Sequence, residues 1–331
     1  MSDTEGRGAG RSTGPDARGP APGPDVETGT PAGGRDAEAD PVATPHQRSQ
    51  TRVIVARFRR HRPAVISLVL LIATAAFAFL GPYVWEWDHL VHREVPGNQP
   101  PSLAHPFGTT NAGHDVLGQL MRGTQQTLKV ALTVSLLATA VGSVWGAVAG
   151  YLRGWPDAIM MRVVDVMLVV PLLVVVSAIG GNFRGGTTWY AVALIIAAFS
   201  WTTISRVVRG VVLSLREQEF VEAARAAGAS GARIVFRHLL PNAAGPIIVA
   251  ATLLIAVAIL LEASMSFLGF GIQSPDISLG LMVDNARTAA FTRPWLFYPP
   301  GLIIVLICLT INFIGDGLRD ALDPRQTMVR R

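Results

Sequence analysis

Charged residues are scarce in this 331-residue chain. Asp, Glu, Lys and Arg make up 15% of it, whereas soluble domains carry about a quarter. The mean hydropathy is +0.39, so the composition points to a protein in contact with lipid. The single cysteine, Cys308, lies in an apolar run, which excludes a disulfide within the chain. The phosphate-binding motif GxxxxGK[ST] is also missing, which excludes a P-loop nucleotide site on this chain.

The balance of charge is basic. The net charge is +5 and the isoelectric point is near 10.1, values that nucleic-acid-binding proteins often show. However, the arginines stand beside long apolar runs, where the preference for positive charge on the cytoplasmic side of a membrane explains them better. We therefore expect no nucleic-acid partner.

Residues 1–50 differ sharply from the rest of the chain. Ile, Leu and Phe are almost absent, and Gly, Pro, Asp, Glu and Arg follow one another without a period. Such a segment buries too little apolar surface to offset the entropy lost on ordering, so we predict a disordered cytoplasmic tail. It has no apolar core segment of the kind found in a secretory signal peptide. Residues 326–331 are predicted to form a short C-terminal tail.

Six apolar runs follow, each near the length of roughly 20 residues that a helix needs to cross a bilayer. An arginine cluster ending at Arg62 precedes the first run, and Tyr83 and Trp85 mark its far end as an interfacial aromatic belt. Gly142 and Gly146 lie in the second run, which we expect to pack closely against its neighbours. The predicted spans are residues 63–85, 130–152, 163–180, 187–205, 243–262 and 294–314, with Pro171 inside the third.

The distribution of Lys and Arg orients these spans. Arginines are concentrated in residues 52–62 and 206–237, and this bias predicts that both termini are cytoplasmic. Residues 86–125 then form a polar external loop, and residues 267–293 form a second one. Within the second loop, residues 278–291 have apolar side chains at helical spacing, which predicts an interfacial helix at the external mouth.

A polar segment, residues 213–242, lies between the fourth and fifth predicted spans on the cytoplasmic side. Its first half has a small apolar face made largely of alanine, and Gly228 suits the left-handed residue that ends a helix. Ser230 can cap a following helix. Pro241 is expected to end that second helix, because proline lacks the N–H donor and clashes one turn back.

This helix, turn and short helix have three interpretations. Binding in a DNA groove is unfavourable, because the membrane spans on both sides leave the segment little freedom. An amphipathic connector lying on the membrane would not account for the small alanine face. Small side chains suit the close approach of another protein surface, so we favour contact with a cytoplasmic partner.

The same segment forms a recognisable pattern. Glu222-Ala223-Ala224, three more residues, Gly228, and then Leu240-Pro241 resemble the "EAA" loop of permease subunits in binding-protein-dependent ABC importers. Further blocks match in order at residues 108–115 (with Asp115), 161–165, 213–216, 262–269 and 315–320. Together they resemble the second, C-type permease subunit of dipeptide, oligopeptide and nickel importers over about residues 52–325.

The resemblance implies an all-α integral membrane protein of the type I ABC importer permease fold, with six transmembrane helices within residues 51–325. It implies a multi-pass protein of the cytoplasmic membrane whose substrate is a peptide or a related small solute such as a nickel chelate. The implied partners are a homologous second permease subunit in a heterodimer, separate cytoplasmic ATPase subunits that bind the ATP, and an extracytoplasmic substrate-binding protein. This chain itself is expected to carry no cofactor.

In such importers the short helices fit a groove on the ATPase, and residues 213–242 are called the candidate coupling loop below. The residues implied in ATPase coupling are Glu222, Ala223, Ala224, Arg225, Gly228, Leu240 and Pro241. The alternative for Glu222 is an ion pair with Arg225 or Arg216 along its own helix.

Two acidic residues, Asp165 and Glu262, lie near the ends of predicted spans. A charge at the bilayer midplane costs about 3 kcal/mol, and less near an interface. Both residues can line the translocation pathway, or serve structure by pairing with a nearby arginine such as Arg162 or by capping a helix. We favour the structural role. The histidines show no ligand spacing, so neither a metal site nor a catalytic residue is expected.

Two other classes of function remain open. A membrane enzyme would need polar groups converging at the midplane, and the spans offer few of them. A membrane scaffold or signalling protein would use the tail, residues 1–50. Deleting that tail distinguishes a transporter from a scaffold, because transport would survive the deletion and a scaffold role would not.

Overall fold

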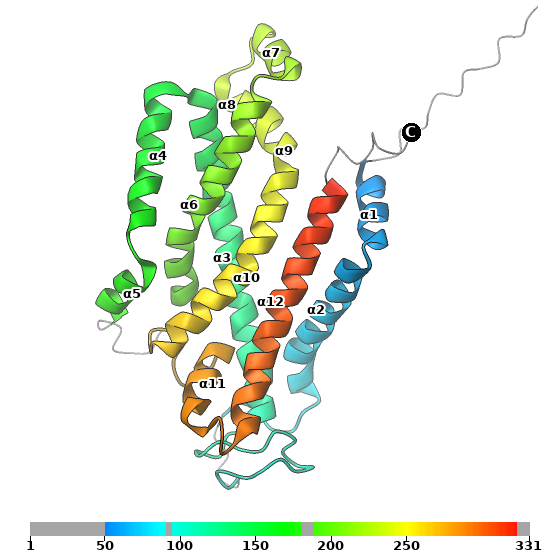
Figure 1. Ribbon diagram of the computed structural model, residues 1–331, viewed down its shortest axis with the longest axis vertical. Helices are drawn as coiled ribbons and strands as arrows, with labels where there is room; N and C mark the ends of the chain where they lie inside the picture. The colour runs from blue at the N-terminus through cyan, green and yellow to red at the C-terminus, as the bar shows by residue number, and fades with distance from the viewer. Residues whose placement is uncertain (1–49, 91–94, 181–187, 323–331) are drawn as a thin grey trace, which may run out of the picture. The chain divides into compact units, whose positions relative to one another are not determined.

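The computed structural model describes residues 50–90, 95–180 and 188–322, and every regular element within them is a helix. The predicted tails, residues 1–50 and 326–331, lie outside the described residues except for Gln50, with which α1 begins. The elements of the remaining unit, which begins at Arg48, form a bundle of long helices (Figure 1).

Five helices in the described part of the chain are long and apolar enough to cross a membrane. They are α2 (Arg62–Leu80, extended by the 3-10 turn Gly81–Tyr83), α3 (Val116–Leu152), α6 (Trp189–Leu215), α10 (Ala244–Phe267) and α12 (Pro294–Leu322). Each of them overlaps one of the predicted spans.

The shorter helices lie at the ends or the edge of the bundle. They are α1 (Gln50–Arg60), α4 (Gly154–Val169), α5 (Leu172–Gly180), α7 (Glu219–Ala226), α8 (Gly231–Arg233), the π-helical segment Ile234–Leu239, α9 (Leu240–Asn242), α11 (Leu279–Ala286) and the 3-10 turn Arg287–Ala289. Figure 1 shows α7 at one end of the bundle and α11 at the other.

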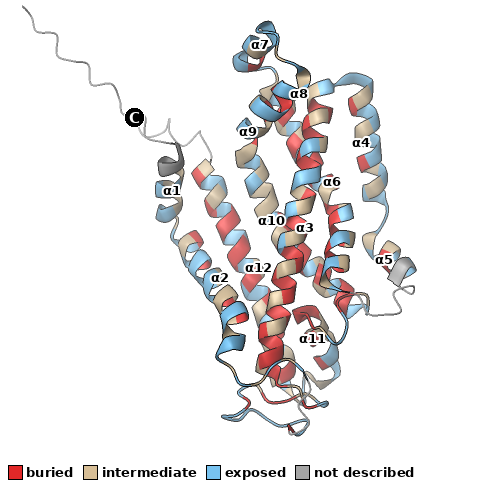
Figure 2. Ribbon diagram, turned by 180° about the vertical axis from the view of Figure 1, so that it is seen from behind, coloured by how far each residue is buried: buried red, intermediate tan, exposed pale blue. Residues whose placement is uncertain are grey.

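Among the described helices α3 and α6 share the most extensive contact, and glycine makes their close approach possible. A Cβ added at Gly142 would lie 2.5 Å from the carbonyl oxygen of Trp201, and one at Gly146 would lie 2.2 Å from that of Ser205. The predicted role of small residues in this span is therefore confirmed. Figure 2 shows buried residues along the facing sides of the helices and exposed residues on the outer sides, where a membrane protein meets lipid.

The second predicted span and the loop before it need correction. The helix begins at Val116 and not at residue 130, so the loop is shorter than residues 86–125. Asp115 caps the helix by accepting a hydrogen bond from the backbone N–H of Gly118 at 2.7 Å. Hydropathy missed these first turns because they contain Arg122 and Gln125, whose polar groups are satisfied by contacts inside the fold.

The third predicted span is not one helix. The chain forms α4 up to Val169 and then α5 from Leu172, and each is too short to be counted among the five long helices. Between them Val170 is extended, with φ −77° and ψ 116°. Pro171 accounts for the break, since it has no N–H to donate and forces the preceding residue out of the helical region.

The ends of two other helices extend beyond the predicted spans. α6 continues past residue 205 to Leu215, and α12 continues past residue 314 to Leu322. Near the end of α12, Asp320 lies 3.6 Å from His61, which caps the start of α2. The first and last long helices are therefore joined at one end.

Candidate functional site

The candidate coupling loop begins where α6 ends, and α7 stands at that end of the bundle as a short exposed helix (Figure 1). Gly228 has a positive φ of 76°. The N–H of Gly228 donates to the carbonyl of Arg225 at 3.0 Å, and that of Ala229 donates to the carbonyl of Ala224 at 3.0 Å. This is the left-handed C-terminal turn that the sequence predicted at Gly228.

The second helix starts as expected but continues further. The Ser230 side chain caps it by accepting from the N–H of Arg233. The prediction that Pro241 ends the helix is wrong, because helical backbone continues through Asn242. The preceding turn, Ile234–Leu239, is π-helical, and the N–H of Leu240 donates to the carbonyl of Val235. This wider turn leaves room for a proline ring, which would clash in a regular α-helix.

The underside of the candidate coupling loop is anchored in an apolar cluster. Val221 of α7, with Ile234 and Leu239 of the π-helical segment, is fully buried, and together they pack with Val208 and Val212 of α6. Burial of this kind stabilises by about 1.5–3 kcal/mol for each large aliphatic side chain. The candidate coupling loop is therefore packed against α6 through buried side chains.

Polar contacts fix the loop to the end of α3. The guanidinium of Arg216 donates to the carbonyl of Tyr151 at 2.8 Å. Glu217 accepts from Arg153 at 3.1 Å and lies 3.3 Å from Arg216. Sequence reasoning missed Glu217 and Tyr151 as positioning residues. A signal was present, since residues 213–216 belong to a matched block and Tyr151 and Arg153 close the second span.

The outer face of α7 is open. Glu222, Ala223 and Arg225 are exposed, and Ala224 is half-buried beneath them. Among the ion pairs of the described residues, none includes Glu222 or Arg225. The alternative pairing of Glu222 with Arg216 is also absent from that part of the chain, because Arg216 turns to Tyr151 and Glu217. α7 thus offers the exposed carboxylates of Glu219 and Glu222 and the guanidinium of Arg225 on a helix whose underside is fixed.

Leu240 and Pro241 follow the π-helical segment and begin α9, whereas Glu222 is on α7. Leu240 is half-buried against the same apolar cluster, and Pro241 is exposed. The structure therefore gives Leu240 a packing contact within the chain.

Both predicted intramembrane acids have partners in the fold. Asp165 lies 2.6 Å from Arg206 of α6 and 3.9 Å from Arg162. Glu262 is fully buried, and its carboxylate accepts from Ser266 at 2.7 Å and from Thr127 of α3 at 3.3 Å. These contacts support structural roles for the two acids, with Arg206 as the stronger partner of Asp165.

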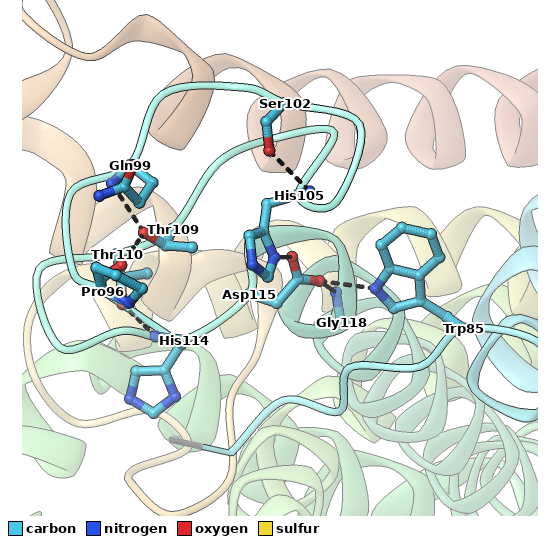
Figure 3. A network of polar contacts seen from close by, with 10 residues as sticks. All are labelled: Trp85, Pro96, Gln99, Ser102, His105, Thr109, Thr110, His114, Asp115 and Gly118. Carbon is cyan, nitrogen blue, oxygen red and sulfur yellow. Dashed lines mark hydrogen bonds and ion pairs between the residues drawn. The ribbon is translucent and has the colours of Figure 1, made fainter. Parts of the chain in front are cut away.

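A hydrogen-bond network orders the loop at the opposite end of the bundle (Figure 3). Asp115 accepts from the indole N–H of Trp85 at 2.9 Å, and its other carboxylate oxygen lies 2.8 Å from Nδ1 of His105. Thr109 donates to the carbonyl of Pro96 at 2.8 Å and accepts from the N–H of Gln99 at 2.9 Å. The matched block at residues 108–115 therefore shapes this loop, which sequence reasoning did not foresee.

The helix predicted within residues 278–291 is present as α11. Its N-terminus is capped by Ser278, and it packs between α3, α10 and α12 with Leu279, Met282 and Ala286 buried. It covers the end of the bundle opposite to α7 (Figure 1). Arg122 reaches the preceding loop, where its Nε lies 2.8 Å from Asp276.

Comparison with known proteins decides the family. Residues 142–328 match the family model described as the inner membrane component of binding-protein-dependent transport systems. The chain belongs to this family. Residues 49–101 match a second model, the N-terminal transmembrane domain of oligopeptide transport permease C.

Curated members of this permease family are similar over most of the chain. The oligopeptide transport system permease protein OppC of Mycobacterium tuberculosis is 40% identical over 285 residues, covering 86% of this chain and 97% of that protein. A peptide permease protein of Brucella suis is 42% identical over 280 residues, covering 81% and 89%. OppC of Bacillus subtilis is 35% identical over 273 residues, covering 81% and 88%.

A solved structure shows the fold of this family. A chain of the MetNI methionine ABC transporter, in an inward-facing conformation, aligns with a TM-score of 0.53 at 20% identity over 62% of this chain and 96% of that chain. The permease is thus an all-α membrane protein of the type I ABC importer fold. Its family consists of multi-pass inner-membrane transporter subunits and not of enzymes, and it implies ATPase and substrate-binding partners.

Proposed function

We propose that this chain is a permease subunit of an ATP-driven importer of peptides and forms half of the translocation pathway. The names of the curated relatives, which are oligopeptide or peptide permeases, support the substrate class. The pathway is completed by a homologous second permease subunit, and a substrate-binding protein delivers the peptide from outside. Separate ATPase subunits bind and hydrolyse the ATP.

The candidate coupling loop is the site of ATPase docking. The observation that carries this proposal is the geometry of α7, whose underside is buried at Val221 while Glu222, Ala223 and Arg225 face outward. Glu222 and Arg225 make the polar contacts, and Ala223 with Ala224 permits close approach. Gly228 sets the turn, and Leu240 with Pro241 completes the loop.

The topology follows from this docking. α7 and the arginine-rich ends of α6 and α2 face the cytoplasm, so both termini lie there and α11 faces outward. α4 and α5 together make the sixth crossing as a helix broken at Pro171. The pathway face carries a groove of about 480 Å³, lined mainly by apolar side chains of α4, α5, α6 and α10 such as Met167, Phe199 and Val257.

A reconstituted transporter tests the proposal. The complex of this chain, its second permease and its ATPases is placed in proteoliposomes with saturating binding protein, and ATP-dependent uptake of radiolabelled trialanine is measured. Glu222→Arg reverses the charge on the α7 face and is expected to lower uptake about tenfold or more, as loss of an interface anchor does. Glu86→Arg makes the same charge change at an exposed residue near the other end of the bundle and serves as the control.

Two results would contradict different parts of this proposal. Wild-type uptake by a normally assembled Glu222→Arg complex would exclude the docking role of α7. ATPase activity that responds to the binding protein without any uptake of trialanine, in the unaltered complex, would instead exclude the peptide substrate and leave the coupling intact.

A further inference from the structure

α4 has unusually few apolar contacts for a helix of this length. Among its residues only Asp157 and Val164 are buried, while Trp155, Ile159, Val166 and others are more than half exposed. It packs only on α3 and α6 among the described elements with several contacts. Apolar burial alone therefore holds α4 weakly in place.

Ion pairs supply the missing attachment. Arg209 of α6 binds Asp157 of α4 in a two-pronged arrangement, with Nε to Oδ1 and Nη2 to Oδ2 both at 2.6 Å. Eight residues later on α4, Asp165 binds Arg206, which lies three residues before Arg209 on α6, at 2.6 Å. The earlier acid pairs with the later arginine, which is the order that antiparallel neighbours require. Two parallel hydrogen bonds between guanidinium and carboxylate fix orientation as well as distance.

The two arginines lie on one face of α6, three residues apart, and α6 is continuous to Leu215. The candidate coupling loop starts at that end and is fixed to it by Val221, which packs on Val208 and Val212. A displacement of α7 is therefore transmitted along α6 to Arg206 and Arg209, because a helix resists bending over this length.

The far end of α4 is free to turn. Val170 is extended and Pro171 has no N–H, so helical hydrogen bonding is interrupted between α4 and α5. Met167 and Leu168 lie just before this break and line the groove of about 480 Å³, opposite Leu253 and Val257 of α10. A movement of α4 about Val170 changes the width of the groove.

We propose that Asp157, Asp165, Arg206 and Arg209 are positioning residues that make α4 move with α6. Through them the candidate coupling loop moves the α4 side of the groove, with the break at Pro171 as the pivot. This inference rests on the proposed function, since it concerns how ATP hydrolysis at the partner is converted into a change of the pathway.

The test measures the number of trialanine molecules imported for each ATP hydrolysed by the complete transporter. Arg209→Ala is expected to lower this ratio about tenfold, a change within reach of coupling residues, while ATPase activity stimulated by the binding protein persists. The charge swap, Asp157→Arg together with Arg209→Asp, is expected to restore the ratio. Arg287→Ala, which breaks an ion pair with Asp284 outside α4 and α6, leaves it unchanged.

A covalent link gives the second readout. Cys308 is replaced by Ser, and cysteines at positions 157 and 209 are joined by a short bis-maleimide. If α4 and α6 move together, cross-linking raises the uptake of this double variant toward that of the wild type. If the cross-link blocks uptake while ATP hydrolysis continues, the two helices separate during transport and the inference is overturned.

The controls distinguish this inference from the proposed function. Unchanged coupling in Arg209→Ala, or a charge swap that assembles normally without recovering uptake, overturns the inference alone. Absence of uptake by the unaltered transporter contradicts the proposed function, and no conclusion on α4 depends on such a preparation.

Discussion

At the scale of single residues, the fold changes the ionisation of His89, which lies in the loop between α2 and α3. Burial lowers the pKa of His89 below its ordinary value of 6.5, and the positive charge of Arg122 lowers it further. Asp88 and Asp276 act in the opposite direction and only reduce the shift. His114 donates from its Nδ1 to the carbonyl of His89 at 3.0 Å, so the backbone beside the ring is tied to the loop network.

This shift predicts a loss of stability in acid. The unfolded chain takes up the His89 proton first as the pH falls, so the stabilisation from neutral His89 is present above 6.5 and is lost as the pH falls toward the folded-state pKa. The melting temperature of the wild type is expected to fall between about pH 7 and about pH 5. His89→Gln, which stays neutral, should show a smaller fall. An equal fall in both proteins would assign the pH dependence to other groups.

Local chemistry made some residues predictable and left others hidden. Gly228 and Ser230 were identified from the sequence because a left-handed turn and an N-cap depend on neighbours within a few residues. The partners of Asp115 were not, because Trp85 and His105 reach it from separate parts of a loop. Arg206 was expected just after the fourth span but lies within α6, and its pairing with Asp165 depends on how α4 lies against α6.

At the scale of elements, the turn between α7 and α8 depends on the backbone conformation of one residue, Gly228. Gly228 has a φ of 76°, and a Cβ added there would meet nothing within 4 Å. A substitution is therefore opposed by the backbone conformation alone, and not by a clash with neighbours.

We expect Gly228→Val to destabilise this turn by about 1–2 kcal/mol, the cost of the left-handed conformation for an ordinary residue, and to displace the α7 face. Uptake should fall although the α7 side chains are unaltered. Gly228→Asn is the matched variant, because asparagine adopts this conformation more readily, and it should keep most of the uptake. Equal uptake by the Val and Asn variants would mean that the turn does not position α7 for docking.

Element boundaries were predictable where apolar runs are unbroken. α10 carries the expected span because its residues are apolar almost throughout. The first turns of α3 were missed because Arg122 and Gln125 are polar, although Asp276 and the carbonyl of Ala78 satisfy them. The break before α5 follows from Pro171, yet sequence alone does not say whether a proline kinks a membrane helix or divides it. The π-helical segment before Pro241 gave no recognisable signal.

At the scale of the whole molecule, a displacement of α7 is expected to pass through α6 to α4 and α3. The fixed underside of α7 transmits displacement to α6, the ion pairs carry it to α4, and α3 follows α6 through their close glycine contacts. Glu262 joins α10 to α3 by way of Thr127 near the other end. Rigid-body rocking of packed helices is a recognised way of converting a small displacement into a change of access.

The docking of α7 on the ATPase is the central claim, and site-specific photo-cross-linking in the assembled transporter tests it most directly. A photoreactive amino acid is placed at position 223 on α7, or at position 291, where Phe291 is 96% exposed near the opposite end of the bundle. Position 223 is predicted to cross-link to the ATPase subunit and position 291 is not. Cross-linking of the ATPase from position 291, with none from position 223, would contradict both the docking site and the proposed orientation.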